Sequence, residues 1–92
     1  MIRSFFHKGL EKFFSTGNKA GIQPSHAKRL RLQLARLNAA VSVADMSLPA
    51  WHLHPLKGEF EGYWSVKVDQ NWRLIFRFEG KDAVRVAYVD YH

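Results

Sequence analysis

The spacing of apolar residues in the first half of the chain predicts two helices. Residues 24–41 carry an apolar side chain at every third or fourth position, namely Ala27, Leu30, Leu34, Leu37 and Val41. That spacing forms one stripe along a helix, and Pro24 suits the first turn because its missing N–H is not needed there. A shorter helix is expected over residues 8–16, where Gly17 provides a natural end. Residues 2–6, which precede it, are apolar enough for a first strand.

After residue 50 the pattern changes to a period of two, which is typical of strands. We expect strands over residues 51–56, 62–68, 72–78 and 83–89. Turn-forming residues at 69–71 and 79–82 join the last three strands into two successive hairpins, and so into an antiparallel meander. The element order is therefore β-α-α-β-β-β-β. It predicts one α+β domain over residues 1–92, with the helices packed against one face of a sheet.

Length and composition fit a single small globular domain. The 92 residues, of which 47% are hydrophobic and 24% charged, suffice for one modest core and exclude a large two-domain enzyme or a disordered chain. The absence of cysteine excludes a disulfide scaffold, a thiol nucleophile and a zinc–thiolate site. No apolar run approaches the ~20 residues of a membrane span, and the opening lacks the apolar stretch of a secretion signal. We therefore expect no membrane partner.

The net charge of +6 comes from the first 50 residues, which hold eight basic and two acidic side chains, against six of each in the remainder. A basic surface attracts polyanions, of which nucleic acid is the most usual, and it also suits an acidic protein partner. Four of the basic side chains lie off the apolar stripe of the second helix: Lys28, Arg29, Arg31 and Arg36. They form either the solvated back of a packed helix or, together with Leu32, a surface for RNA or a partner protein.

Three segments collect polar residues that packing does not require. The first, residues 52–58, contains His52 and His54, which would point the same way on a strand. A third metal ligand has no obvious source, so we expect no metal site there. The others are Asn71-Trp72-Arg73, at a turn, and Val89-Asp90-Tyr91-His92, at the end of the chain. Both also have a structural explanation, because an isolated strand arginine is usually exposed or paired and chain ends usually fray.

Together these residues match the requirements of RNA cleavage without a metal or other cofactor. A base removes the proton of the 2′-hydroxyl, an acid protonates the departing 5′-oxygen, and cations stabilise the extra negative charge on the phosphate. Histidine suits acid or base chemistry because its pKa lies near neutrality, and arginine and lysine suit the phosphate. The candidates for these catalytic roles are His54, Lys57, Arg73, Asp90, Tyr91 and His92.

Four short motifs, in this order, resemble the HigB toxins of the RelE/ParE superfamily. They are His54-Pro55-Leu56-Lys57-Gly58, Gly62-Tyr63-Trp64-Ser65, Asn71-Trp72-Arg73-Leu74-Ile75-Phe76 and the final Asp90-Tyr91-His92. The opening, Met1 to Leu10, is also similar to the start of that family, so the resemblance covers nearly the whole chain. Each motif is weak alone, and the specific signal is their order and spacing.

The resemblance implies a toxin of a type II toxin–antitoxin pair in the bacterial cytoplasm. Such toxins are ribosome-dependent endoribonucleases that cleave mRNA in the decoding site of the 70S ribosome and thereby stop translation. A helix-turn-helix antitoxin, HigA, neutralises the toxin and represses the shared operon, so any contact with operator DNA would pass through the antitoxin. The implied fold is compact and RelE-like, with two N-terminal helices on a small mixed, mostly antiparallel sheet that includes the first strand.

The resemblance also implies which residues act. His54 or His92 would activate the 2′-hydroxyl, with Asp90 holding or tuning a histidine. Arg73 and Lys57 would bind the scissile phosphate, and Tyr91 would stack on a base or donate a hydrogen bond. Asn71 would contact RNA. Separately from the resemblance, the charge of the basic residues on the second helix suggests a general attraction to ribosomal RNA or a docking face for the antitoxin. His52 is not part of the family pattern.

Two other functions stay open from the sequence. A ParE-like relative would poison gyrase on the same fold, but it would not need the acid–base set of His54, Asp90 and His92. A non-catalytic module that binds RNA or the ribosome would depend on the basic residues of the second helix, and its histidines would be dispensable. A neighbouring reading frame for a helix-turn-helix protein would favour the toxin.

Overall fold

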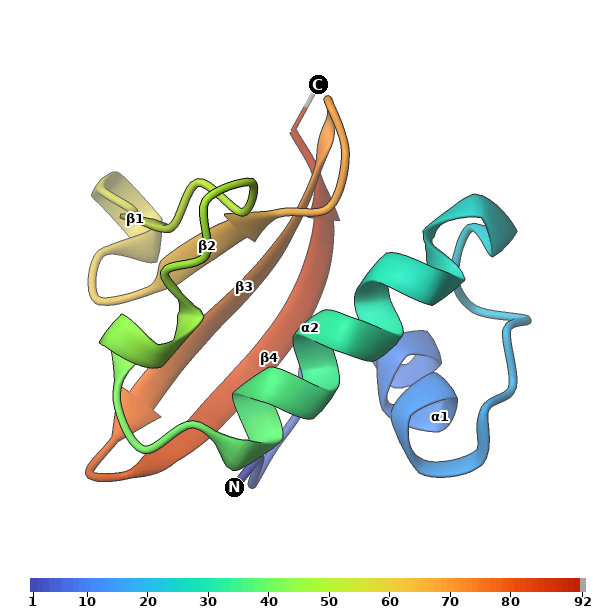
Figure 1. Ribbon diagram of the computed structural model, residues 1–92, viewed down its shortest axis with the longest axis horizontal. Helices are drawn as coiled ribbons and strands as arrows, with labels where there is room; N and C mark the ends of the chain where they lie inside the picture. Colours follow the sequence, from blue (N-terminus) through green and yellow to red (C-terminus); the bar gives the residue numbers. More distant parts are fainter. Residues whose placement is uncertain (92) are drawn as a thin grey trace.

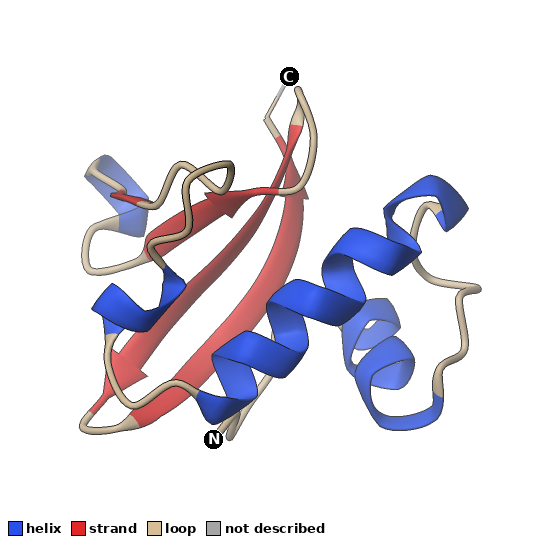
Figure 2. Ribbon diagram, viewed as in Figure 1, coloured by secondary structure: helices blue, strands red, loops and turns tan. Residues whose placement is uncertain are grey.

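The computed structural model describes residues 1–91 and arranges them as helices on one face of a sheet (Figures 1 and 2). Within these residues, the helices α1 (Lys8–Thr16) and α2 (Ala27–Ala39) precede all the strands. The strands are β1 (His54–Pro55), β2 (Trp64–Lys67), β3 (Trp72–Glu79) and β4 (Asp82–Asp90). Short 3₁₀ helices lie at Pro24–His26, Val43–Met46 and Gly58–Phe60. The predicted α+β class is confirmed.

Helix α1 begins and ends where local hydrogen bonds satisfy its free backbone groups. The Nδ1 atom of His7 accepts a hydrogen bond from the N–H of Leu10 (2.9 Å), which caps the first turn. Gly17 ends the helix with a left-handed φ of 81°, and its N–H donates to the carbonyl oxygen of Phe13 (2.8 Å). The bounds of α1 agree with the predicted helix over residues 8–16.

Helix α2 is shorter than the apolar stripe predicted. The chain leaves the helix at Ala40, whose backbone is extended (φ −69°, ψ 144°). The Asp45 carboxylate accepts hydrogen bonds from the N–H groups of Val41 (2.9 Å) and Ser42 (3.3 Å), which caps the following 3₁₀ turn instead. Val41 is therefore 59% exposed, and its predicted place on the buried stripe is wrong. The other members of the stripe are buried as predicted: Ala27, Leu30, Leu34 and Leu37.

The strands follow the order β1-β2-β3-β4, and each neighbouring pair is antiparallel. Strand β1 has two residues instead of the six predicted over 51–56, because His52 takes a left-handed φ of 50° that interrupts the extended backbone. Trp51 packs into the core, and its carbonyl oxygen accepts a hydrogen bond from the N–H of Lys67 (2.7 Å). The expectation that His52 and His54 share a regular strand is therefore wrong.

The N-terminal segment lies alongside β4. Ile2 and Phe5 form isolated parallel bridges to Ala83 and Val86, in place of the continuous strand predicted over residues 2–6. Backbone hydrogen bonds of 2.8–3.1 Å join the two segments. This parallel pairing makes the sheet mixed, as the resemblance to HigB toxins implied.

The main core lies between the helices and one face of the sheet. Alternate residues of β3 contribute to it, as predicted: Trp72, Leu74, Phe76 and Phe78. The start of α1 closely approaches the loop that follows the helix. A Cβ atom on Gly9 would lie 2.6 Å from the carbonyl oxygen of Gly21, so this backbone-to-backbone contact requires glycine.

The other face of the sheet, called the open face below, bears the residues that alternate with the core positions. One row across the strands consists of His54, Ser65, Ile75 and Ala87, and the next of Lys67, Arg73 and Val89. A small buried cluster formed by Leu56, Tyr63 and Ile75 gives this face an apolar floor. Two of the predicted catalytic residues, His54 and Arg73, lie in the two rows of this face.

Candidate active site

The register of the strands puts His54 and Arg73 on the same side of the sheet. His54 lies opposite Ser65 of β2, and Arg73 lies opposite Lys67, two residues further along the same strand. Side chains that are directly opposed in antiparallel strands share a face, as do residues two apart on one strand. Standard strand spacings put the Cα atoms of His54 and Arg73 about 12 Å apart. A histidine and an arginine at that separation can reach different atoms of one nucleotide bound between them.

Arg73 is held in place by the turn before β3. Its Nη1 atom donates to the carbonyl oxygens of Asp69 (3.0 Å) and Trp72 (3.2 Å). Its guanidinium carbon lies 5.6 Å from the centre of the Tyr91 ring, in a cation–π contact. The side chain is half-buried, so the cation has a defined direction. A guanidinium oriented in this way suits the recognition of a phosphate.

Tyr91 reaches Arg73 through a backbone hydrogen bond at the end of the sheet. The N–H of Tyr91 donates to the carbonyl oxygen of Asn71 (2.5 Å), which continues the pairing of β3 with β4 beyond Trp72 and Asp90. Tyr91 is 44% exposed, and Asn71 is exposed at the turn. An accessible aromatic ring beside a fixed cation is the arrangement on which an unstacked base can lie.

His54 lies at the β1 edge of the open face, Lys57 follows β1 two residues after its end, and both are exposed. The Nδ1 atom of His54 is 3.1 Å from the carbonyl oxygen of His52. In the neutral ring this contact places the proton on Nδ1 and leaves Nε2 as the basic nitrogen. Sequence reasoning missed Lys67, which is half-buried directly opposite Arg73. Strand alternation pointed to its face, but no motif marked it.

Asp90 lies at a register position on the core-facing side of the sheet, and not on the open face. It is exposed at the end of β4 and lies opposite Trp72, whose side chain contributes to the core. The structure therefore brings Asp90 to the same end of the sheet as Arg73 and Tyr91, but not onto the open face. His92 lies outside the described residues. Its predicted role, and that of Asp90 in tuning a histidine, stay predictions.

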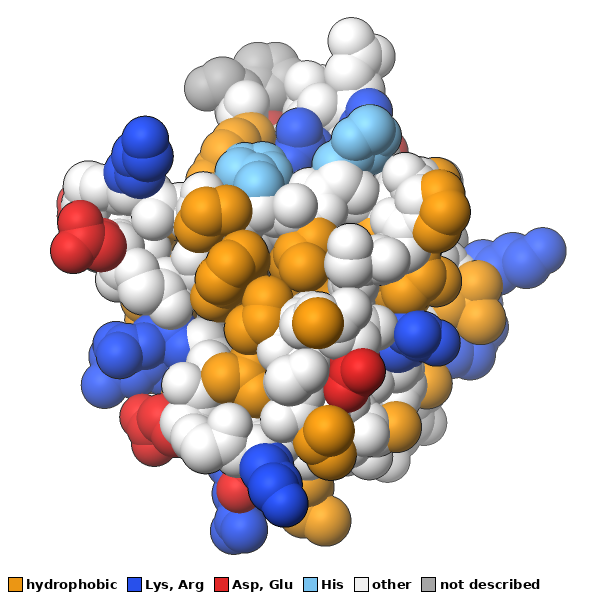
Figure 3. All heavy atoms as spheres, turned by 60° about the vertical axis from the view of Figure 1, so that its left-hand side comes forward, with side chains coloured by type: hydrophobic (Ala, Val, Ile, Leu, Met, Phe, Trp, Pro, Cys, Tyr) orange, Lys and Arg blue, Asp and Glu red, His pale blue; other side chains and the backbone are white. Residues whose placement is uncertain are grey.

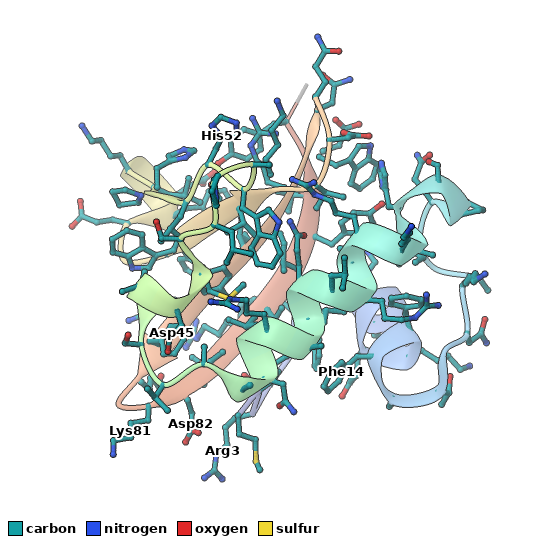
Figure 4. The ribbon with its side chains drawn as sticks, viewed as in Figure 1. Arg3, Phe14, Asp45, His52, Lys81 and Asp82 are labelled. Atoms are coloured by element: carbon teal, nitrogen blue, oxygen red, sulfur yellow. The ribbon has the colours of Figure 1, made fainter. Side chains whose placement is uncertain are left out.

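Histidine and basic side chains gather at one end of the molecule. Histidine side chains and Lys or Arg side chains lie close together near the end at which β4 finishes (Figure 3). His52 lies toward this end, whereas Arg3 and Asp82 lie at the opposite end (Figure 4). The Nε atom of Arg3 is 3.0 Å from Oδ2 of Asp82 there. That ion pair is therefore remote from the candidate site.

A buried polar group that sequence reasoning missed lies beside the turn before β3. His26 is 5% exposed and lies between Asp69 and Tyr88: its Nε2 atom is 2.5 Å from Oδ2 of Asp69, and its Nδ1 atom contacts the Tyr88 hydroxyl. The ring of Trp72 stacks on Tyr88 with 4.4 Å between centroids. The sequence offered no pattern for this group, because its members are far apart along the chain.

Burial and hydrogen bonds shift two pKa values in this group. Desolvation by burial acts to raise the pKa of Asp69, but hydrogen bonds from His26 and from the N–H groups of Trp72 and Asn71 outweigh it and hold the pKa below its usual value. Desolvation raises the pKa of Tyr88, and the charge of Asp69 adds to the increase. Near neutral pH, Asp69 is therefore a carboxylate and Tyr88 keeps its hydroxyl proton.

Two of the basic residues predicted to bind RNA form hydrogen bonds with the chain itself. Arg29 donates from Nη2 to the carbonyl oxygens of Ala50 (2.9 Å) and Lys67 (3.2 Å). Arg36 donates from Nε to the carbonyl oxygen of Asp45 (2.7 Å). Both arginines thus attach α2 to neighbouring loops, whatever else they contact.

The other two, Lys28 and Arg31, are exposed, and Arg31 lies 5.7 Å over the ring of Phe13. A hollow of about 320 Å³ opens beside Arg31 between α1 and α2, and Phe14 and Leu34 contribute to its lining. This hollow contains none of the predicted catalytic residues, so it is not the candidate site. Because α2 packs on the core face of the sheet, the structure does not bring the basic set to the open face. Its role in RNA binding stays a prediction.

Two further observations concern ligands and membranes. Within residues 1–91, no three histidine, aspartate or glutamate side chains come together as metal ligands would. In the same part of the chain, no helix has the length and apolar character needed to cross a membrane.

The model of a protein family, the RelE-like toxin of type II toxin–antitoxin system HigB, matches residues 3–92. The chain belongs to this HigB family of toxins. It is 40% identical to the Endoribonuclease HigB of Proteus vulgaris over 92 residues, which cover 100% of both chains. It is also 30% identical to the Toxin HigB-1 of Vibrio cholerae over 94 residues, which cover 100% of this chain and 98% of the relative. The predicted family is confirmed.

Solved structures of toxins share the fold. A copper-bound mutant toxin from Helicobacter pylori superposes with a TM-score of 0.55 at 16% identity, covering 99% of this HigB-family chain and 96% of the other. A mutant of YafQ from E. coli gives a TM-score of 0.51 at 21% identity, covering 95% and 92%. These likenesses are of fold alone. They confirm the helices-on-a-sheet architecture that was predicted for a RelE-like toxin.

Proposed function

We propose that this HigB-family toxin is an endoribonuclease that cleaves mRNA in the decoding site of the ribosome and so stops translation. The endoribonuclease activity is supported by the similarity, over both full lengths, to the Proteus vulgaris relative of that name. The observation that carries the proposal is the placement of His54, Arg73 and Tyr91 on one side of the sheet's end. These residues supply an acid–base nitrogen, an oriented cation and an accessible aromatic ring.

The proposed reaction proceeds by attack of the RNA on itself. A base removes the proton of a 2′-hydroxyl as its oxygen attacks the adjacent phosphorus, the bond from phosphorus to the 5′-oxygen breaks, and an acid protonates that oxygen. The products are a 2′,3′-cyclic phosphate and a 5′-hydroxyl. His54 and His92 share the roles of base and acid, and Asp90 tunes a histidine. No metal ion takes part.

The remaining residues act on charge and position. Arg73 and Lys57 stabilise the negative charge that grows on the phosphate, Asn71 contacts the RNA, and Tyr91 stacks on a base. The site is an open surface and not a pocket, because three of its side chains are exposed: His54, Lys57 and Tyr91. Such a surface needs a substrate whose geometry is already fixed, and mRNA held in the decoding site meets that need.

We further propose the partners of the toxin. A HigA-like helix-turn-helix antitoxin neutralises it in the bacterial cytoplasm, and operator DNA is contacted through the antitoxin. The basic side chains of α2, with exposed Leu32 among them, attract ribosomal RNA or receive the antitoxin.

The test is cleavage of a reporter mRNA on translating ribosomes by His54→Ala, Arg73→Ala and His92→Ala variants. Each should lose about 100-fold or more in rate, which is the lower end of the range for a catalytic acid, a catalytic base or a donor that stabilises developing charge. Arg77→Ala is the matched control, because Arg77 lies on the same strand, is also half-buried and contacts a different tyrosine, Tyr63. If all three variants cleave like the parent, the assignment of the site is wrong.

A further inference from the structure

The buried group of His26, Asp69 and Tyr88 joins the start of α2 to the turn that presents Arg73. Both ring nitrogens of His26 are engaged, Nε2 by the Asp69 carboxylate and Nδ1 by the Tyr88 hydroxyl. A carboxylate only accepts, so in the neutral ring the proton lies on Nε2 and the Tyr88 hydroxyl donates to Nδ1. The Tyr88 oxygen in turn accepts from the N–H of Gln23 (3.5 Å). The three side chains are thus satisfied in one consistent arrangement.

Asp69 transmits this constraint to the turn. Its Oδ1 atom accepts hydrogen bonds from the N–H groups of Asn71 and Trp72, both at 2.9 Å. Its backbone carbonyl oxygen accepts from Nη1 of Arg73 at 3.0 Å. Through three different oxygen atoms, Asp69 therefore holds His26, the backbone of the turn and the guanidinium that faces the open side.

The same turn holds Tyr91. Its N–H donates to the carbonyl oxygen of Asn71, and its ring lies under the guanidinium of Arg73. A displacement of the turn would move Arg73 and Tyr91 together relative to His54, which lies on a different strand. A misplacement of about 1 Å, caused by a change away from the reacting atoms, can lower a rate by as much as about 100-fold.

We propose that His26 and Asp69 are positioning residues for the open-face site. His26 fixes the carboxylate of Asp69, and Asp69 fixes Arg73 and Tyr91 at the distance from His54 that catalysis requires. The proposal rests on the proposed endoribonuclease function and names residues that serve it from behind the sheet. Neither residue touches the RNA.

The fold offers a way to loosen the turn without detaching the strand. Gln33 donates from Nε2 to the carbonyl oxygen of Lys67 (2.9 Å), and Arg29 donates to the same oxygen. These bonds anchor the end of β2 to α2 independently of His26. Loss of the contact between His26 and Asp69 should therefore leave β2 in place and affect the turn at 69–72.

Two replacements separate the contacts of His26. In His26→Gln the side-chain amide extends as far as Nε2 and can donate to Asp69. In His26→Asn the shorter amide reaches the position of Nδ1, beside Tyr88, and cannot reach Asp69. Asp69→Ala removes the carboxylate from the other side, and because Asp69 is itself exposed, that variant removes no apolar contact from the core. Asp82→Asn, at the opposite end of the molecule, is the control for loss of a carboxylate (Figure 4).

Single-turnover cleavage of a reporter mRNA on ribosomes measures the effect on the reaction. We expect His26→Asn and Asp69→Ala each to lower the cleavage rate by at least about tenfold, and His26→Gln to stay within about threefold of the parent. Ribosome affinity should fall less than the cleavage rate in all of them, because neither replaced side chain itself contacts the RNA. When Asp69 is already replaced by alanine, His26→Asn should lower the cleavage rate no further, because both replacements break the same contact between His26 and Asp69. Equal losses for the Gln and Asn variants, or additive losses in the double variant, would overturn the proposal.

Amide hydrogen exchange in the free protein tests the geometry without relying on cleavage. The N–H groups of Tyr91 and Trp72 should exchange faster in His26→Asn and at the parental rate in His26→Gln. The N–H of Arg3, which donates to Ala83 at the far end, should be unchanged in both. If this pattern appears but the parent does not cleave mRNA on ribosomes, the proposed function is wrong and the coupling stands. If the parent cleaves and exchange is unaltered, the positioning proposal is wrong.

Discussion

The replacement Arg73→Lys tests whether the geometry of the guanidinium contributes to the cleavage rate beyond its positive charge. In the structure, two carbonyl oxygens hold Nη1 of Arg73, and its other edge, Nε and Nη2, is the pair of donors suited to a phosphate. A lysine keeps the positive charge, but it presents one ammonium group on a flexible stem and loses the planar contact with Tyr91.

The expected loss follows from the hydrogen bonds that lysine cannot make. A hydrogen bond to a charged group contributes about 1.5–3 kcal/mol, and each 1.36 kcal/mol of transition-state stabilisation is about tenfold in rate. Loss of one such bond therefore predicts a decrease of about 10- to 150-fold in the single-turnover cleavage of reporter mRNA on ribosomes. Stability should change little, because the side chain is half-buried and its charge is kept.

Arg77→Lys provides the matched control. Arg77 lies on the same strand, is half-buried to a similar degree and lies 5.6 Å over the ring of Tyr63, as Arg73 does over Tyr91. It should lose less than about twofold. If Arg73→Lys cleaves within about threefold of the parent, or if both lysine variants lose equally, the assignment of Arg73 to the phosphate fails.

Two further predictions concern stability. Gly9→Ala places a methyl group 2.6 Å from the Gly21 carbonyl oxygen and should lower the free energy of unfolding by about 1–3 kcal/mol in urea denaturation, whereas exposed Lys8→Ala should not; equal stability of the two variants would contradict the close contact. A hydrogen bond from Arg3 lowers the pKa of Asp82 from 3.8. The interaction of the Asp82 carboxylate with Arg3 therefore stabilises the folded state fully above the unfolded pKa of Asp82. That stabilisation is lost as the pH falls through the lower pKa that Asp82 has in the folded state. Between neutral pH and about pH 3, the parent should lose more stability than Asp82→Asn, and equal losses would refute this.

The periodic parts of the fold could be predicted from the sequence, because burial of one face repeats along a regular element. The stripe on α2 and the alternation along β3 both placed the core residues correctly. Val41 was misplaced because a carboxylate four residues later, Asp45, caps its N–H. The strand over 51–56 was overestimated because the left-handed backbone of His52 has no signal in residue type.

Long-range pairing produced the features that a single sequence does not reveal. Arg85 has a left-handed φ of 55° at a register shift between β3 and β4, so that Ala83 and Val86 both reach the core and strict alternation breaks. The N–H of Arg85 donates to Oγ of Ser4 (2.9 Å), which lies 81 residues earlier. No local pattern of apolar residues can anticipate such a bulge.

The same contrast between local sequence patterns and long-range packing applies to the candidate site. Motif resemblance identified Arg73 and Tyr91, and the strand register brings them together with His54 on one side of the sheet. It did not identify His26 or Asp69, whose contact spans 43 positions in the sequence. Catalytic candidates belong to short segments with recognisable chemistry, whereas the groups that hold them depend on how distant segments pack.

The central claim is that this HigB-family protein cleaves mRNA when a ribosome holds it. The most direct measurement maps the 5′ ends of a reporter mRNA after incubation with the protein, with and without translating ribosomes. The account predicts cleavage within the decoding site on ribosomes, with 5′-hydroxyl products, and little cleavage of free mRNA. Equal cleavage of free and ribosome-bound mRNA, or no cleavage in either sample, would contradict it.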